Sequence, residues 1–284
     1  MMVFLNGEFV PEAEAKVSVF DRSFLYGDAL FETMRVHNGK PFRWKQHWKR
    51  LEQGADTLKI EIPYASRELL ARAEELIRRN EMPEGVLRLH LSRGVGTRGY
   101  SPLGADNPVL VLTTHRAASV DLLQPPRWTL ATATLRLPMG NALSQPKHAN
   151  RLLHVLAKAE AQAKGAEDAL LLNTEGDVVE AASANLFYIQ HEVICTPPLA
   201  GGALAGVTRG LIFELCKKLG FECQEKAITP EKLLKAKGVF LTLSTLGIVE
   251  VTRIDGALIS SSPLVTDLQG EYWEVLQTET ARAI

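Results

Sequence analysis

The chain has 284 residues, of which 46% are hydrophobic and 23% are charged, and its formal net charge is -1. This composition is typical of a soluble globular protein with one large or two ordinary domains. The near-zero charge, without any basic run, gives no reason to expect a nucleic-acid partner.

Membrane and metal functions are also not indicated. No apolar run approaches the roughly 18 residues of a membrane span, and the first residues, Met1 to Glu8, turn polar too soon for a signal peptide. Cys195, Cys216 and Cys223 lack CxxC spacing, so we expect neither a disulfide framework nor a metal site. We therefore expect a cytoplasmic protein with no membrane contact.

The first half of the chain predicts a mixed α/β domain. A hairpin is expected from Val3 to Val10 around the turn Asn6-Gly7, and Val17 to Phe20 suggests another short strand. The predicted elements that follow are a strand ended by Asn38-Gly39, helices from Trp44 to Leu58 and from Ser66 to Arg79, and strands from Val86 to Ser92 and from Val109 to Thr114. A glycine-rich loop, Arg93 to Pro102, joins the last two strands. Such loops often carry substrate contacts, although a mobile hairpin tip fits the pattern equally well.

A linker divides the chain near its middle. The segment Arg116 to Arg127 contains two adjacent prolines and no periodicity, so we place an N-terminal domain at 1–118, a linker at 119–127 and a C-terminal domain at 128–284. The second domain is expected to contain strands Trp128 to Leu135, Ala169 to Asn173, Leu186 to Ile189, Val193 to Cys195 and Val239 to Leu243, and helices Leu152 to Lys164, one ending near Gly220, and Thr229 to Ala236.

Two residues stand out for their chemistry. Lys147 follows a proline at the end of a loop, and Glu180 ends a short apolar strand before a corner of small residues. A pyridoxal phosphate enzyme needs such a pair. The amine forms a Schiff base with the cofactor, and the carboxylate keeps the pyridine nitrogen protonated. A surface lysine and a solvated glutamate are the alternative, and for isolated residues that alternative is the commoner one.

A third feature suits an anion. The small-residue loop from Pro197 to Arg209 runs into an amphipathic helix, whose first N–H groups lie at the positive end of the helix dipole. An ordinary loop–helix join would have the same composition.

Together these residues resemble the fold-type IV pyridoxal phosphate enzymes, or class IV aminotransferase family, over nearly the whole chain. The matching blocks are Tyr26-Gly27-Asp28 through Phe31-Glu32, His47 with Arg50-Leu51, Lys147, Glu180-x-Ala-x-x-Asn185-Leu186-Phe187, Ile194-Cys-Thr196 and Leu204-Ala-Gly206-Val207-Thr208-Arg209. The resemblance implies a two-domain α+β fold, with a smaller N-terminal α/β domain and a larger, β-barrel-like C-terminal α/β domain that carries the Schiff-base lysine. It also implies pyridoxal 5'-phosphate as cofactor and a homodimer.

The resemblance assigns roles residue by residue. Lys147 is the Schiff-base lysine and proton carrier, and Glu180 faces the pyridine nitrogen. Arg50 binds the cofactor phosphate, as the expected arginine for a buried dianion. The remaining phosphate contacts are expected from Val207, Thr208, Ser244 and Thr245. The expected substrate-binding residues are Tyr26, Phe31, Arg98 and Tyr100.

Three reactions are compatible with these roles. The strings Lys147-His148-Ala149-Asn150-Arg151-Leu152 and Arg98-Gly99-Tyr100-Ser101 are similar to aminodeoxychorismate lyases, which release pyruvate from 4-amino-4-deoxychorismate to give 4-aminobenzoate. Ser244-Thr245-Leu246-Gly247 is instead closer to the transaminases. Because two strings favour the lyase and one the transaminases, we predict a lyase acting on a small-molecule amine, with Arg98 as partner for a substrate carboxylate. The alternative is an aminotransferase for branched-chain or D-amino acids with 2-oxoglutarate. A non-catalytic cofactor-binding or scaffold protein is a third class, which would be expected to lack one of the key residues.

Overall fold

The computed structural model describes residues 1–118, 120 and 124–281, which group into two compact units. Among these residues, unit 1 consists of Met1–Ala118, Pro146–Asn150 and 276–281, and unit 2 of residues 120, 124–145 and 151–275. Residues 119 and 121–123 of the predicted linker lie outside the described residues.

Unit 1 is built on a six-stranded antiparallel sheet. Its strands, in the spatial order β2-β1-β6-β5-β3-β4, are β1 (Met2–Leu5), β2 (Glu8–Pro11), β3 (Ala29–His37), β4 (Lys40–Pro41), β5 (Gly85–Ser92) and β6 (Val109–His115). Its helices are α1 (Arg22–Tyr26), α2 (Trp44–Leu58) and α3 (Ser66–Arg79). The predicted hairpin forms: Leu5 pairs with Glu8, and Asn6 and Gly7 both have positive φ, as a two-residue hairpin turn requires.

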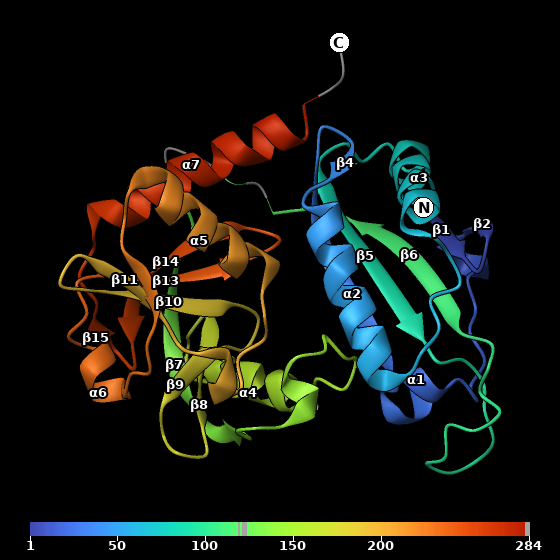
Figure 1. Ribbon diagram of the computed structural model, residues 1–284, viewed down its shortest axis with the longest axis horizontal. Coiled ribbons are helices and arrows are strands. Elements are labelled where there is room, and N and C mark those ends of the chain that lie inside the picture. The colour runs from blue at the N-terminus through green and yellow to red at the C-terminus, as the bar shows by residue number, and fades with distance from the viewer. Residues whose placement is uncertain (119, 121–123, 282–284) are drawn as a thin grey trace. The chain divides into compact units, whose positions relative to one another are not determined.

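The two faces of this sheet differ because successive side chains of a strand point to opposite sides. Leu87, Leu89 and Leu91 of β5 are buried in a hydrophobic core that also contains residues of α2 and α3. Figure 1 shows these two helices beside the sheet. Arg88 and His90, which alternate with these leucines, therefore lie on the other face, which we call the open face.

Unit 2 contains a closed ring of strands. Its strands are β7 (Arg127–Leu137), β8 (Asp168–Asn173), β9 (Val178–Ala181), β10 (Asn185–Gln190), β11 (Val193–Thr196), β12 (Cys223–Glu225), β13 (Val239–Leu243), β14 (Gly247–Ile254) and β15 (Ala257–Leu258). Six of them pair in the order β10-β13-β14-β7-β8-β9, and β9 pairs back onto β10 through Glu180 and Asn185. This closure makes the sheet barrel-like, and β11 and β12 extend it outward from β10.

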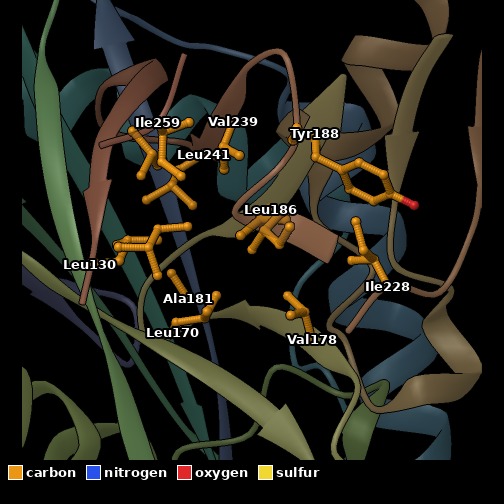
Figure 2. Packing of buried hydrophobic residues seen from close by; sticks show 14 of the residues in the cluster. Leu130, Leu170, Val178, Ala181, Leu186, Tyr188, Ile228, Val239, Leu241 and Ile259 are labelled. Atoms are coloured by element: carbon orange, nitrogen blue, oxygen red, sulfur yellow. The ribbon is translucent and has the colours of Figure 1, made fainter. Parts of the chain in front are cut away.

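Apolar side chains fill the interior of unit 2. Figure 2 shows leucine, isoleucine, valine and tyrosine side chains from several strands converging on one cluster. The labelled members are Leu130, Leu170, Val178, Ala181, Leu186, Tyr188, Ile228, Val239, Leu241 and Ile259. A ring of this size is filled by its own side chains, so chemistry is expected at its ends and not inside it.

The helices of the second half are α4 (Leu152–Ala163), α5 (Val207–Leu219), α6 (Pro230–Leu233) and α7 (Pro263–Glu279). Short 3-10 turns lie at Glu12–Glu14, Ala142–Ser144 and Leu199–Gly201. Within the part of the chain that the structure describes, none of the helices has the length and apolarity needed to cross a membrane.

The segment that carries Lys147 groups with unit 1, whereas the sequence predicted it in the C-terminal domain. The reason is backbone pairing with β3. The Phe31 N–H donates to the Lys147 carbonyl at 2.9 Å, and the Ala149 N–H donates to the Ala29 carbonyl at 2.7 Å. The domain limits predicted around this segment otherwise stay a prediction.

The expected strand Val17 to Phe20 is wrong. These residues form coil and a turn, in which the Asp21 N–H donates to the Ser18 carbonyl, and Val17, Val19 and Phe20 are exposed. The apolar run fits a strand in composition but finds no partner strand among the described residues.

Candidate active site

Lys147 lies against Phe31, the residue predicted to bind substrate. The backbone bonds to β3 fix the main chain of Lys147, and its Nζ lies 4.6 Å from the centre of the Phe31 ring. Phe31 itself pairs with His90 across β3 and β5 and so belongs to the open face. The amine is therefore held over an aromatic ring, where a cation–π contact stabilises its charged form.

Arg88 is a second cation at the same ring, and sequence reasoning missed it. Its guanidinium carbon lies 4.2 Å from the Phe31 ring centre. Burial lowers the pKa of Arg88 from its usual value. No described carboxylate lies within ion-pair distance of it. The available signal was a lone arginine alternating with three leucines in β5, which places a charge on the open face.

Glu32, His47 and Arg50 form a buried charged cluster on the other side of β3. Arg50 donates from Nε and Nη2 to the Glu32 carboxylate at 2.8 and 2.6 Å, and Nδ1 of His47 lies 2.6 Å from Glu32 Oε2. Burial alone would raise the pKa of Glu32, but Arg50 and His47 outweigh it and lower that pKa to about 2. Burial lowers the pKa of His47 from its usual value, and the neighbouring Glu32 opposes that shift.

The hydrogen bonds to Glu32 fix the side chain of Arg50, a residue of helix α2. The predicted role of Arg50 as the phosphate arginine stays a prediction, because the contacts described above are to Glu32. Glu32 and His47 belong to the sequence blocks that carry the resemblance, but their function as supports for Arg50 was not anticipated.

The remaining predicted substrate residues of unit 1 lie at the loop 94–102. Arg98 and Tyr100 are exposed there, Tyr100 at 88%. Tyr26 reaches the loop from α1: its hydroxyl accepts from the Gly99 N–H at 3.2 Å, and its ring packs edge-on against Tyr100. Arg22, missed by sequence reasoning, donates to the carbonyls of Gly99, Tyr100 and Ser101.

In unit 2, Glu180 is buried where β9 meets β10. Its Oε2 accepts from Asn185 Nδ2 at 3.0 Å and from the Leu204 N–H at 3.1 Å, and His154 Nε2 lies 3.6 Å from Oε1. The two hydrogen-bond donors orient the carboxylate. The sequence predicted Asn185 only as part of a motif, and the structure shows that its side chain donates to Glu180.

The start of helix α5 has the features of an anion site. The residue before the helix is Gly206, which has no side chain to cap it. No N-cap hydrogen bond therefore occupies the first N–H groups of the helix, those of Val207 and Thr208. A Cβ on Gly206 would lie 1.9 Å from Asn185 Oδ1, so only glycine fits here. Ser244 and Thr245 follow β13, the strand on which α5 packs. These donors and the oriented Glu180 suit a ligand with a phosphate and a basic ring nitrogen.

Metal chemistry has no equivalent support. No group of three or more histidine, cysteine, aspartate or glutamate side chains within the described ranges could hold a metal ion.

Comparison with known proteins identifies the family. Residues 29–254 match the model described as "Amino-transferase class IV". The chain belongs to the class IV aminotransferase family. The resemblance inferred from sequence and the predicted α+β fold with a barrel-like sheet are confirmed. The family uses pyridoxal phosphate, so the chain is an enzyme of the pyridoxal phosphate class IV family, either a lyase or an aminotransferase.

The relatives carry three different activities in their names. The chain is 35% identical over 267 residues to a putative branched-chain-amino-acid aminotransferase of Methanocaldococcus jannaschii, covering 92% of this chain and 90% of that one. It is 34% identical over 254 residues to an aminodeoxychorismate lyase of Vibrio harveyi, covering 89% and 91%. It is 30% identical over 287 residues to a D-alanine aminotransferase of Bacillus licheniformis, covering 100% of both.

Solved structures show the same division. A putative 4-amino-4-deoxychorismate lyase of Legionella pneumophila superposes with a TM-score of 0.86 at 30% identity, covering 93% of this chain and 97% of that one. The branched-chain aminotransferase of the thermophilic archaeon Thermoproteus uzoniensis, solved with norvaline, gives a TM-score of 0.90 at 28% identity, covering 98% and 96%. This chain therefore shares its family with proteins that are named for different reactions, and its own reaction depends on the residues of its site.

Proposed function

We propose that this protein is a pyridoxal phosphate-dependent lyase that releases pyruvate from 4-amino-4-deoxychorismate. The observation that carries the proposal is the pair of cations at Phe31, with Lys147 Nζ at 4.6 Å and Arg88 at 4.2 Å from one ring centre. The substrate carries one amine and two carboxylates. Lys147 meets the amine, Arg88 meets one carboxylate, and Arg98 on the loop 94–102 meets the other.

Arg88 is suited to this role by its surroundings. The half-buried guanidinium of Arg88 has lost part of its hydration, and no described carboxylate compensates for that loss. An incoming substrate carboxylate would do so through charge-assisted hydrogen bonds, which are about twice as strong as neutral ones.

When bound, the cofactor supplies an aldehyde that captures the substrate amine and a ring that accepts electrons from the adjacent carbon. Lys147 takes the proton from the amine-bearing ring carbon. The bond between the ring and the enolpyruvyl oxygen then breaks, and Lys147 returns a proton to the departing group, which leaves as pyruvate. The six-membered ring becomes aromatic, with no external oxidant or reductant required.

The other residues hold the reacting groups in place. Glu180, oriented by Asn185 and the Leu204 N–H, would keep the ring nitrogen of the cofactor protonated. The phosphate would be bound by Arg50, by the N-terminus of α5 at Val207 and Thr208, and by Ser244 and Thr245.

An aminotransferase is the second candidate, because relatives of similar identity are aminotransferases by name. Arg88 would then bind the carboxylate of the amino acid. In that reaction Lys147 would move the proton from the α-carbon to the cofactor carbon and a keto acid would be released.

One experiment separates the two reactions. The cofactor-loaded protein is mixed with aminodeoxychorismate, and separately with leucine or D-alanine plus 2-oxoglutarate, and the products are identified. Pyruvate and 4-aminobenzoate are expected from the first mixture. Arg88→Met and Arg98→Ala should each reduce pyruvate release about 10- to 100-fold, the value of a lost charge-assisted hydrogen bond.

Arg72→Ala is the matched control, because Arg72 is an exposed arginine on α3 and its loss should leave the rate unchanged. Formation of keto acid without any pyruvate release would replace the lyase by an aminotransferase.

A further inference from the structure

One carboxylate in unit 1 joins two arginines. Asp28 Oδ2 accepts from Arg22 Nε at 2.9 Å and from Arg93 Nε at 2.7 Å, and Asp28 Oδ1 accepts from Arg93 Nη2 at 3.1 Å. Arg22 and Arg93 are buried, so these pairs are shielded from water. Burial alone would raise the pKa of Asp28, but the hydrogen bonds from the two arginines outweigh it and lower that pKa.

The far ends of the two arginines hold main-chain carbonyls. Arg22 donates to the carbonyls of Gly99, Tyr100 and Ser101, each at 3.0 Å. Arg93 donates to the Leu58 and Lys59 carbonyls at 2.6 and 2.8 Å, where helix α2 ends. The network therefore ties the loop 94–102 to the end of the helix that carries Arg50.

The loop is shaped around Arg22. The Arg22 N–H donates to the Gly94 carbonyl at 2.9 Å, and a Cβ on Gly96 would lie 3.1 Å from Arg22 Cδ and 2.9 Å from Ala105 Cβ. A larger residue at position 96 would push against the arginine. Three consecutive carbonyls held by one planar guanidinium leave residues 99–101 little freedom.

We propose that Asp28, Arg22 and Arg93 are positioning residues that hold the loop 94–102 in the conformation in which Arg98 meets the substrate carboxylate. The carbonyls held by Arg22 begin at the residue directly after Arg98, so the network fixes the backbone from which the Arg98 side chain extends. This inference rests on the proposed function only in giving Arg98 a substrate carboxylate.

Removing the Asp28 charge should free the loop. In Asp28→Asn the two neighbouring guanidiniums lose their shared counter-charge and repel each other. Arg22 then loses the orientation that directs it to the loop carbonyls. Affinity for the substrate falls because Arg98 is no longer held in place, while the proton transfers at Lys147 are unaffected.

Limited proteolysis measures the release of the loop without any substrate. Trypsin cleaves the peptide bond between Arg98 and Gly99. Two hydrogen bonds hold Gly99 in place: its N–H donates to the Tyr26 hydroxyl, and its carbonyl accepts from Arg22. Cleavage after Arg98, identified by fragment mass, should be at least about tenfold faster in Asp28→Asn than in wild type.

Glu75→Gln is the matched control. Glu75 also joins two arginines, Arg78 and Arg79, but does so on the exposed surface of α3, away from the loop. Its loss should change neither the cleavage after Arg98 nor the kinetics.

Steady-state kinetics provide the second measurement. For the substrate that the wild type converts, KM should rise about tenfold in Asp28→Asn with kcat within about twofold. Arg22→Lys, which leaves the Asp28–Arg93 pair intact, should shift KM and cleavage in the same direction, and it serves as the test if Asp28→Asn does not fold.

Two results would overturn the inference. One is cleavage and KM in the variants equal to those of Glu75→Gln. The other is faster cleavage with an unchanged KM, which would make the network a structural tie alone. If the wild type releases no pyruvate, KM is measured with the amino acid that it converts, so failure of the lyase proposal is distinguished from failure of this one.

Discussion

At the scale of single residues, Glu32 is the side chain on which the charged cluster of unit 1 depends. It is buried at 1% exposure and accepts from both His47 and Arg50. The guanidinium of Arg50 and the carboxylate of Glu32 form an ion pair in which both side chains are buried. Glu32 therefore holds the guanidinium of Arg50 in a fixed position on helix α2. A phosphate-binding arginine requires such a fixed position.

We expect Glu32→Gln to destabilise the protein at neutral pH by about 3 kcal/mol or more, because the buried guanidinium of Arg50 loses the negative charge of the carboxylate to which it donates two hydrogen bonds. The pKa of Glu32 is lowered from 4.5 to about 2 in the folded state. Its contribution is therefore fully present above pH 4.5 and is lost as the pH falls towards 2. Urea unfolding at about pH 7, 5 and 3 measures this, and the difference between wild type and variant should shrink with acid.

The partly exposed Glu75 provides a control, because the pKa of Glu75 is also lowered to about 2 but its arginine partners lie at the solvent-exposed surface. The effect of Glu75→Gln should be abolished by about 1 M salt, whereas that of Glu32→Gln should persist. A Glu32→Gln protein as stable as wild type at neutral pH would show that the cluster is not held by charge.

At the scale of elements, the close approach of Asn185, at the start of β10, to Gly206, the residue before α5, decides whether Glu180 is oriented. A Cβ on Gly206 would collide with the amide of Asn185, which itself donates to Glu180. The positions of Gly206, Asn185 and Glu180 therefore depend on one another, although these residues are separated along the chain.

Gly206→Ala should displace Asn185 and weaken cofactor retention by about tenfold, because Glu180 loses one of its two donors. Gly210→Ala on the same helix is the matched control: a Cβ at Gly210 would meet nothing within 4 Å. That substitution should raise stability by about 0.4–1 kcal/mol through the better helix propensity of alanine. Dialysis followed by measurement of retained cofactor checks both, and equal retention in the two variants would contradict the account.

Local patterns were enough to predict many elements. The helix Trp44–Leu58 and the hairpin at Asn6-Gly7 match the structure because periodicity and turn residues determine them locally. The strand expected at Val17 to Phe20 failed because a strand also needs a partner. The position of Arg88 at the Phe31 ring was missed for a similar reason: its environment is created by Phe31 and Lys147, far away in sequence.

At the scale of the whole molecule, the family and its chemistry could be predicted from sequence, but the grouping of Lys147 could not. The motif blocks around Glu180 and Thr208 carry distinctive side chains. The bonds that tie the Lys147 segment to β3 are between backbone groups, which leave no mark in the sequence. Arg22 and Asp28 are likewise visible in the sequence only as two charged residues.

The central claim is that Lys147 is the residue to which pyridoxal phosphate is attached. Borohydride reduction of the purified protein, followed by digestion and mass analysis, tests it most directly. We expect about one phosphopyridoxyl group per chain, located on Lys147, and none in a Lys147→Ala protein. Lys158, a lysine of unit 2 that lies 3.4 Å from Asp168, should stay unlabelled. A label at wild-type stoichiometry on another lysine, or in the Lys147→Ala protein, would contradict the account.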